Sequence, residues 1–315
     1  MNLAEHAVAA AARLLPHPSD PSPTDLHRLR RGTPSGRAAR WVTGELPASV
    51  SVRAHTVPGA GVDLAVRMYR RRGSTSDRRP LVVCFHGGGF VIGDPAQVEW
   101  MCGSLTDQLD AVVASVAYRR APEHPAPIPA DDCIAATRWL IQHAEKYGAD
   151  PERVSVTGVS AGATLAALVA QTLRADDRPV RRQVLIYPAT DMTLSSPSVE
   201  EFSRGPILTR PLLAWFGDRY LPVGADGAPV IGYDDPRVSP IHADLAGLPP
   251  ALVLVAGRDA LRDDGIRYAH ALRSAGVPAQ LIIYADAMHG FVSMPGISPS
   301  AHRAVSAMVR FLDAA

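Results

Sequence analysis

Short apolar runs alternate with longer segments of helical periodicity along most of the chain. From residue 50 onward the short runs are rich in β-branched residues and end in turn residues, which predicts β-strands. The predicted strands are Val50–Thr56, Val62–Tyr69, Leu81–Phe85, Val112–Ala117, Val154–Thr157, Val184–Tyr187, Leu252–Ala256 and Leu281–Tyr284. The first two alternate apolar and polar positions around Pro58-Gly59-Ala60-Gly61 and predict an antiparallel hairpin. The later runs are continuously apolar, as in parallel strands that are buried on both faces.

Helical segments separate these strands. The predicted helices are Gln97–Leu109, Pro129–Tyr147, Ala161–Ala175, Asp263–Ala275 and Ser300–Leu312. Because strands and helices alternate, we expect an α/β fold with a mostly parallel, eight-stranded sheet that is flanked by helices.

Two segments interrupt the alternation. Residues 191–235 follow a strand, contain five prolines, and offer one helix-like stretch at Leu208–Leu221. A long insertion after a parallel strand is often a lid over a site at the carboxyl edge of the sheet. Residues 1–45 also lie outside the alternation, and we expect them to pack with the insertion. Within them, Met1–Leu15 predicts an amphipathic helix, because it lacks the basic start and the A-x-A site of a signal peptide.

Composition and charge exclude several classes of protein. The chain is 47% hydrophobic and 20% charged, as in globular proteins, and 32 basic against 31 acidic residues leave a net charge of +1. This balance argues against nucleic-acid or anionic-membrane partners. No apolar run approaches the roughly 18 residues that span a bilayer. Three cysteines without CxxC spacing argue against a disulfide framework and a zinc site, and favour a cytoplasmic location.

A serine follows one buried strand in the pattern Gly158-Val159-Ser160-Ala161-Gly162 and precedes an Ala-rich helix. G-x-S-x-G between a strand and a helix is typical of a nucleophile elbow, where neighbouring side chains would clash with the strained turn. The helix that starts at Ala161 directs backbone N–H groups toward the place where an oxyanion forms. The pattern therefore predicts Ser160 as a nucleophile; the alternative is a serine-glycine turn that only caps a helix.

An acid and a histidine follow late strands in the order that a Ser-acid-His triad requires. Asp259 is the first carboxylate after the strand ending at Ala256, and His289 follows the last strand. An acid in this position holds the imidazole in the tautomer that accepts a proton from serine. The alternatives are a turn aspartate and a surface histidine.

Three neighbouring carboxylates are weaker candidates for the acid. We expect Asp263 and Asp264 in the first turn of the next helix, where the helix dipole favours negative charge. Asp286 is too close to His289 in sequence to orient it in the usual way.

Three consecutive glycines follow another strand in Phe85-His86-Gly87-Gly88-Gly89-Phe90. Their backbone N–H groups can approach a ligand oxygen without obstruction, as an oxyanion requires. A phosphate loop is the alternative, but no Gly-Lys-Ser/Thr follows and Lys146 is the only lysine in the chain. We expect His86 to fix the loop by hydrogen bonds. No His/Asp/Glu cluster has ligand spacing, so neither a metal nor a cofactor is expected.

Six motifs in this order resemble those of the hormone-sensitive-lipase-like family of α/β-hydrolase esterases, from about Ser49 to the C-terminus. They are His86-Gly-Gly-Gly-Phe90, Tyr118-Arg-Arg-Ala-Pro-Glu-His-Pro125, Gly158-Val-Ser-Ala-Gly162, Tyr187-Pro-Ala-Thr-Asp191, Asp259-Ala-Leu-Arg-Asp263 and His289-Gly-Phe291. Val159 and Ala163 depart from the family pattern, which has a polar residue and a glycine at these positions.

The resemblance implies an α/β-hydrolase domain of residues 46–190 and 236–315, with a helical cap of residues 1–45 and 191–235. It implies Ser160, Asp259 and His289 as triad, and Gly87, Gly88 and Ala161 as oxyanion hole. It also implies a homodimer through the last strand and helix. Candidate pocket residues are Phe90, Phe202, Trp215 and Phe216, for which cap or core packing is the alternative.

The function that we expect is hydrolysis of short- to medium-chain acyl esters through an acyl-enzyme, with small uncharged esters as substrates. Two alternatives remain at this stage. The first is an amidase, lactonase or deacetylase of the same fold, and the second is a relative that binds ligands without catalysis.

Overall fold

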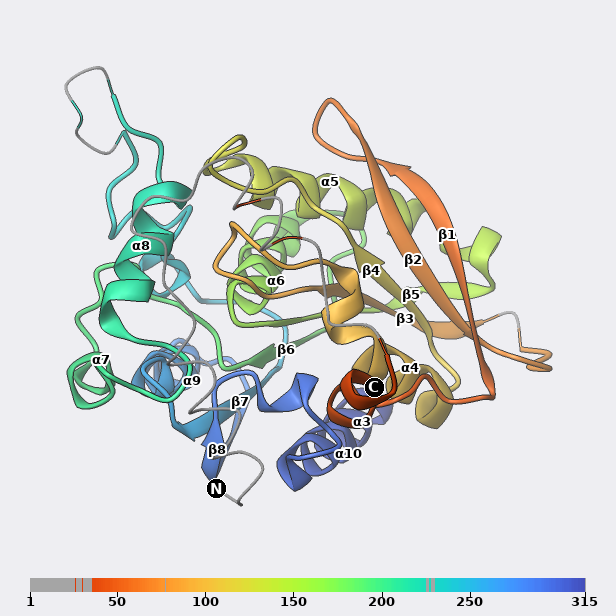
Figure 1. Cartoon of the computed structure of the whole chain (residues 1–315). Helices are drawn as coiled ribbons and strands as arrows, with labels where there is room; N and C mark the ends of the chain where they lie inside the picture. The colour runs from red at the N-terminus through yellow and green to blue at the C-terminus, as the bar shows by residue number, and fades with distance from the viewer. Residues whose placement is uncertain are drawn as a thin grey trace.

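An eight-stranded sheet runs through the centre of the molecule in the order β1-β2-β4-β3-β5-β6-β7-β8 (Figure 1). The computed structural model describes residues 26, 30, 36–76, 78–224, 227 and 230–314. The strands are β1 (Val50–Pro58), β2 (Asp63–Arg71), β3 (Arg79–Phe85), β4 (Val112–Val116), β5 (Ala149–Val159), β6 (Arg182–Ile186), β7 (Ala251–Arg258) and β8 (Ala279–Met288). β1 and β2 form an antiparallel hairpin, β2 is antiparallel to β4, and all other pairs are parallel. The expected fold class and all eight predicted strands are confirmed.

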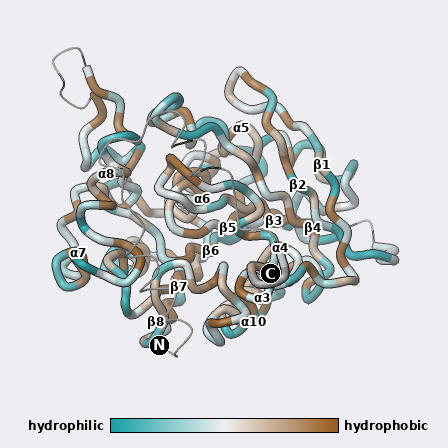
Figure 2. The backbone as a smooth tube through the Cα atoms, viewed as in Figure 1, coloured by the Kyte–Doolittle hydropathy of each residue, from teal (hydrophilic) through white to brown (hydrophobic). Residues whose placement is uncertain are grey.

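Helices cover both faces of this sheet. They are α4 (Glu99–Leu109), α5 (Ile128–Gln142), α6 (Ala161–Thr172), α9 (Arg262–Ser274) and α10 (Pro299–Asp313), each of which overlaps a predicted helix. The continuously apolar strands bury alternate side chains in two separate cores. One core contains residues of α5, α6 and α9, and the other contains residues of α4 and α10. Figure 2 shows hydrophobic residues recurring along the central strands and α6.

The chain between β6 and β7 carries the predicted insertion. It contains α7 (Pro197–Glu201) and α8 (Arg210–Tyr220), which lie together on the side of the molecule away from β1 and β2 (Figure 1). α8 matches the helix-like stretch that the sequence indicates. Thr209 caps it by accepting a hydrogen bond from the Leu212 N–H at 3.2 Å, and Pro211 stands in its first turn, where proline costs no hydrogen bond.

The described part of the N-terminal region is α3 (Arg37–Thr43) with Leu26 and Arg30. The predicted helix Met1–Leu15 and most of residues 1–45 lie outside the described residues. Leu26 is buried in the core of α5, α6 and α9, and Arg30 donates to the Val91 carbonyl at 2.8 Å. Among the residues that the structure describes, no helix combines the length and the apolar character needed to cross a membrane.

Candidate active site

Parallel strand pairing brings four loops together at the carboxyl edge of the sheet. Phe85 pairs with Gly158 across β3 and β5, so the glycine loop that follows β3 lies beside the G-x-S-x-G turn that follows β5. Arg258 pairs with Met288 across β7 and β8, so the next residue on each strand, Asp259 and His289, leave the sheet side by side. The register alone therefore places the predicted acid and histidine together.

The turn between β5 and α6 has the backbone strain of a nucleophile elbow. Ser160 has φ 55° and ψ −124°, a conformation that side chains rarely adopt. A Cβ at Gly158 would lie 2.1 Å from the Gly162 carbonyl oxygen, and one at Gly162 would lie 2.2 Å from that of Phe85. Both glycines are therefore required for the serine to stand clear of the sheet.

Two hydrogen bonds connect Ser160, His289 and Asp259. His289 Nε2 lies 2.9 Å from Ser160 Oγ, and its Nδ1 lies 2.6 Å from Asp259 Oδ2. Asp259 is only 1% exposed, and its other oxygen accepts the Leu261 N–H at 3.0 Å. A carboxylate at Nδ1 fixes the proton on that nitrogen and leaves Nε2 as the acceptor for the serine hydroxyl.

The neighbouring groups distinguish Asp259 from the weaker acid candidates. Asp263 lies in the first turn of α9, as the sequence predicts, and so does Asp264. Asp286 is exposed on β8.

The His289 imidazole has a further contact besides its two hydrogen bonds. The Tyr187 ring packs against it, with ring centroids 4.6 Å apart, and this packing restricts the orientation of the imidazole.

Three residues of the predicted oxyanion hole line the same cavity as Ser160. Gly87, Gly88 and Ala161 line one cavity together with Ser160 and His289. None of the three N–H groups donates a hydrogen bond to any residue that the structure describes. Ala161 is the first residue of α6, where N–H groups have no partner within the helix. These donors are therefore available to an oxygen atom bound beside Ser160.

His86 holds the glycine loop rather than the reacting atoms. Its Nδ1 lies 2.7 Å from the Gly87 carbonyl oxygen, and its ring stacks on Tyr118 with centroids 4.3 Å apart. The Tyr118 hydroxyl donates to the His86 carbonyl at 2.8 Å. Burial lowers the pKa of His86 to about 4, so the ring is neutral near pH 7 and donates from Nδ1. The expected role in fixing the loop agrees with these contacts.

A cavity of about 400 Å³ opens in front of Ser160. Of the four aromatic residues predicted to line a pocket, Phe90 and Phe216 do so. Among the described residues Phe202 and Trp215 are not part of this lining: Phe202 lies against the Arg262 guanidinium, and Trp215 packs edge-on against Phe216. The difference arises because the aromatic residues of the insertion face different partners, which composition does not reveal.

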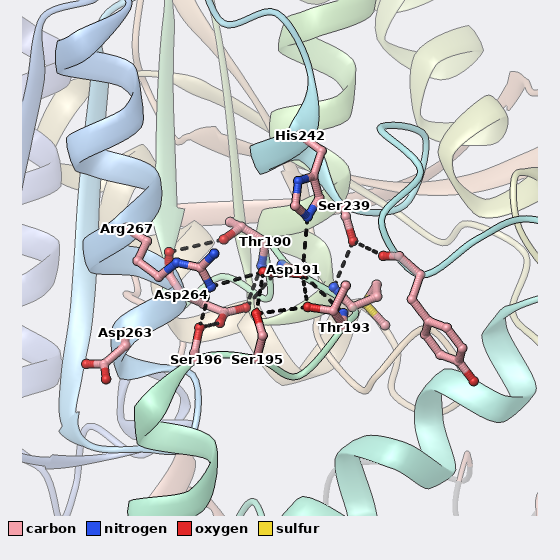
Figure 3. Close-up of polar contacts among 12 residues, drawn as sticks. Thr190, Asp191, Thr193, Ser195, Ser196, Ser239, His242, Asp263, Asp264 and Arg267 are labelled. Carbon is pink, nitrogen blue, oxygen red and sulfur yellow. Dashed lines mark hydrogen bonds and ion pairs between the residues drawn. The ribbon is translucent and has the colours of Figure 1, made fainter.

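Several functional candidates escape sequence reasoning because they depend on contacts between distant segments. The aliphatic side of the cavity is formed by Met192, Leu194, Ile207, Leu208, Leu212, Leu213 and Leu261. Asp191 also lines the cavity and belongs to a cluster of polar residues that includes the buried Asp264 and the partly exposed Arg267 (Figure 3). The sequence signals for this cluster are Asp191, which ends the Tyr187–Asp191 motif, and the pair of acidic residues in the first turn of α9; neither signal indicates that the two segments meet. Within the described residues, no group of three or more His, Cys, Asp or Glu side chains is arranged to hold a metal ion.

Comparisons with known proteins agree with this geometry. The family model described as alpha/beta hydrolase fold matches residues 82–293. Esterase LipI of Mycobacterium tuberculosis is 42% identical over 72% of this chain and 70% of its own length. Carboxylesterase NlhH of the same organism is 37% identical over 86% of each chain. The structure of a hyperthermophilic esterase from the archaeon Pyrobaculum calidifontis is 40% identical, covers 84% of this chain and 85% of its own, and has a TM-score of 0.78.

The chain therefore belongs to the α/β-hydrolase family, among its hormone-sensitive-lipase-like esterases. It is a carboxylic ester hydrolase of the serine type. The resemblance that the six sequence motifs carry is thereby confirmed.

Proposed function

We propose that the protein hydrolyses carboxylic esters through an acyl-enzyme on Ser160, with His289 as general base and acid and Asp259 as the group that orients it. One observation carries this assignment. Two hydrogen bonds of 2.9 and 2.6 Å run from Ser160 through His289 to Asp259, and the serine end opens into a cavity of about 400 Å³. This is the arrangement in which a serine can lose its proton as it attacks a carbonyl carbon.

In the first half-reaction Ser160 Oγ attacks the ester carbonyl while His289 Nε2 accepts the hydroxyl proton. Asp259 stabilises the imidazolium that forms, without taking the proton itself. The carbonyl oxygen becomes an oxyanion and accepts hydrogen bonds from the free N–H groups of Gly87, Gly88 and Ala161. The imidazolium then protonates the leaving alkoxide, and the alcohol departs from the acyl-enzyme.

In the second half-reaction a water molecule takes the place of the alcohol. His289 accepts a proton from this water as it attacks the acyl carbonyl, and the same N–H groups stabilise the second oxyanion. Collapse of this intermediate returns the proton to Ser160 and releases the carboxylic acid. No step requires a group beyond the side chains, the backbone and water.

We further propose that residues 191–235, together with residues 1–45, serve as a cap that limits the acyl chain to short and medium length. Support comes from Phe216 and Leu212 on α8, which line the same cavity as Ser160. A cavity of about 400 Å³ accommodates a small ester, and the aliphatic lining favours uncharged acyl groups. Activity is expected to fall for acyl chains beyond about ten carbons.

Two finer proposals concern partner and location. We propose a homodimer in which β8 and α10 meet those of a second copy, because β8 is an edge strand with Ile283 46% exposed. Sedimentation of the wild type and Ile283→Lys tests this, since a dimer that uses β8 should dissociate in the variant.

A cytoplasmic location is supported by the free thiols of Cys84, Cys102 and Cys133.

A series of p-nitrophenyl esters from acetate to laurate, assayed with the wild type and Ser160→Ala, tests the proposed chemistry. We expect the variant to lose kcat by a factor on the order of 10⁵ to 10⁶ while it remains folded by circular dichroism. Equal rates in the two proteins would contradict the role of Ser160. The matching p-nitroanilides separate esterase from amidase, because the proposal requires faster turnover of the esters.

A further inference from the structure

The first residues of the insertion are fastened to the first turn of α9. Asp264 Oδ2 accepts the backbone N–H groups of Thr190 at 3.0 Å and Asp191 at 3.2 Å. The Thr190 hydroxyl returns a hydrogen bond to the Asp264 carbonyl oxygen at 3.1 Å, and the Ser196 hydroxyl bonds to Oδ1. Asp264 is 1% exposed, so these contacts are shielded from solvent (Figure 3).

The carboxylate of Asp191 accepts further hydrogen bonds from the same short segment of the chain. Asp191 accepts the Thr193 N–H and hydroxyl at 3.1 and 2.6 Å and the Ser195 hydroxyl at 3.1 Å. His242 and Arg267 complete its shell at 3.3 and 3.0 Å. Eight donor groups thus bind the carboxylates of Asp191 and Asp264, and six of these donors belong to residues 190–196.

Four ionisable groups make up this cluster. Asp191 and Asp264 contribute two carboxylates, Arg267 on α9 contributes a guanidinium, and His242 contributes an imidazole that contacts Asp191. Burial raises the pKa of Asp264 to about 7, and the charge of Asp191 adds to this increase. Burial also opposes ionisation of Asp191, but hydrogen bonds from Thr193, His242 and Arg267 outweigh it and lower the pKa to about 2.

The fastened segment and the triad acid share one support. Asp191, Met192 and Leu194 line the cavity on the insertion side. Leu261 lines it as well, and its N–H orients Asp259 at 3.0 Å, only three residues before Asp264. The start of α9 therefore fixes both a wall of the cavity and the carboxylate that holds His289.

We propose that Asp264 is a positioning residue for ester hydrolysis, which sets the cavity wall of Asp191, Met192 and Leu194 relative to Asp259. This inference rests on the proposed function. Asp264 touches neither the serine nor the oxyanion donors, so it acts through the backbone of Thr190 and Asp191. Loss of its carboxylate frees the wall and weakens binding of acyl chains long enough to reach it, while a minimal acetyl group is handled almost as before.

The neighbouring carboxylate provides a matched control. Asp263 stands in the same helical turn but points away from the cluster (Figure 3). It accepts the Ser198 N–H at 2.9 Å and pairs with Arg262 at 2.8 Å, and it does not line the cavity formed by the described residues. Asp263→Asn therefore changes charge and helix-dipole interaction at the same turn without releasing the wall.

The first experiment measures kcat and KM for p-nitrophenyl acetate and hexanoate in the wild type, Asp264→Ala, Asp264→Asn and Asp263→Asn. We expect Asp264→Ala to lower the hexanoate-to-acetate ratio of kcat/KM about tenfold, mainly through the KM for hexanoate. Asp264→Asn keeps an oxygen for the two N–H groups and should recover the ratio to within about threefold, and Asp263→Asn should stay within about twofold. Equal losses for both esters, or the same change in Asp263→Asn, overturn the proposal.

The second experiment follows the same ratio with pH and remains decisive if Asp264→Ala does not fold. Ionisations that act on the chemical steps shared by the two esters affect both values of kcat/KM alike and cancel in the ratio. We expect the wild-type ratio to change between pH 6 and 8.5, where Asp264 ionises, and the Asp264→Asn ratio to stay constant. Parallel pH profiles of this ratio in the two proteins overturn the proposal.

Labelling of Ser160 by a p-nitrophenyl phosphonate tests the proposed function apart from the role of Asp264. A wild type that is neither labelled nor active contradicts the proposed function and not the inference about Asp264.

Discussion

The ring of Phe216 on α8 lies directly against the backbone of Gly89 in the loop after β3. A Cβ added at Gly89 would stand 2.2 Å from Phe216 Cγ, closer than any side chain tolerates, and Gly89 has φ +58°. The insertion and the glycine loop therefore meet at a contact that only glycine permits. Both residues line the cavity, so this contact sets how far α8 stands from Ser160.

Gly89→Ala should displace Phe216 and lower kcat/KM for p-nitrophenyl hexanoate. Part of its cost is backbone strain of about 1 kcal/mol at positive φ, and the rest is the clash with the ring. Phe216→Ala removes only the ring, so the double variant should be less impaired than the sum of the two single variants. The free energies of unfolding in urea should show a coupling of roughly 0.5 to 3 kcal/mol. Strict additivity would show that the ring contact is not the source of the effect.

Asp259→Asn should reduce kcat by about 10⁴-fold, because an amide at His289 Nδ1 no longer favours the tautomer that accepts the serine proton. Asp286→Asn is the matched control: it removes a carboxylate three residues before His289 that is exposed on β8. Steady-state kinetics with p-nitrophenyl butyrate measures both. A comparable loss in the two variants would remove the distinction between the acid and its neighbour.

Gly88→Ala should disrupt the oxyanion loop more than strain alone explains. Gly88 has φ +111°, and a Cβ there would lie 2.2 Å from the Ile92 carbonyl oxygen, so the loop must move. Gly73→Ala provides the control, because Gly73 also has a positive φ, of +69°, but has open space around it. We expect a cost of about 1 kcal/mol for Gly73→Ala without loss of activity.

For Gly88→Ala we expect, in addition, a loss of about 10² to 10³ in kcat, the effect of a displaced oxyanion donor. Thermal melts and kinetics of both variants separate the two contributions. If Gly88→Ala kept the wild-type kcat, the N–H of this loop would not serve the oxyanion.

Local patterns were sufficient to predict the strands, the main helices and the order of Ser160, Asp259 and His289. Strand register then explains why the last two meet, since the pairing of Arg258 with Met288 aligns the residues that follow. These features depend on hydrophobic periodicity and on turn chemistry, both of which a short window of sequence contains.

Contacts made by the insertion could not be predicted in the same way. Phe202 and Phe216 are both aromatic and lie on the same segment, yet one packs on Arg262 and the other lines the cavity. The hydrogen bonds of Asp264 join residues 73 and 74 positions apart. Such contacts depend on how the insertion docks on α9, and the sequence alone contains no periodic signal for that arrangement.

The buried carboxyl of Asp264 should also give the stability of the fold a distinctive pH dependence. Its pKa is raised to about 7, so between about pH 4 and pH 7 the native state retains a proton that the unfolded chain releases. Stability from this group is therefore greatest below pH 4 and is lost as pH rises toward 7. Asp264→Asn cannot titrate and lacks this slope.

Melting temperatures of the wild type and Asp264→Asn at pH 5 and pH 8.5 test this sign. The advantage of the wild type should shrink or reverse at the higher pH, by about 3 kcal/mol, because about two pH units separate pH 5 from a pKa of about 7. Asp191→Asn tests the coupling between the two carboxylates. The pKa of Asp191 is lowered to about 2, so its own contribution is already complete above pH 4. Its charge also raises the pKa of Asp264, so the destabilisation that the variant causes should be smaller at pH 8.5, where Asp264 is ionised, than at pH 5. A wild-type advantage that grows with pH at Asp264 would mean that this carboxyl is held in its ionised form.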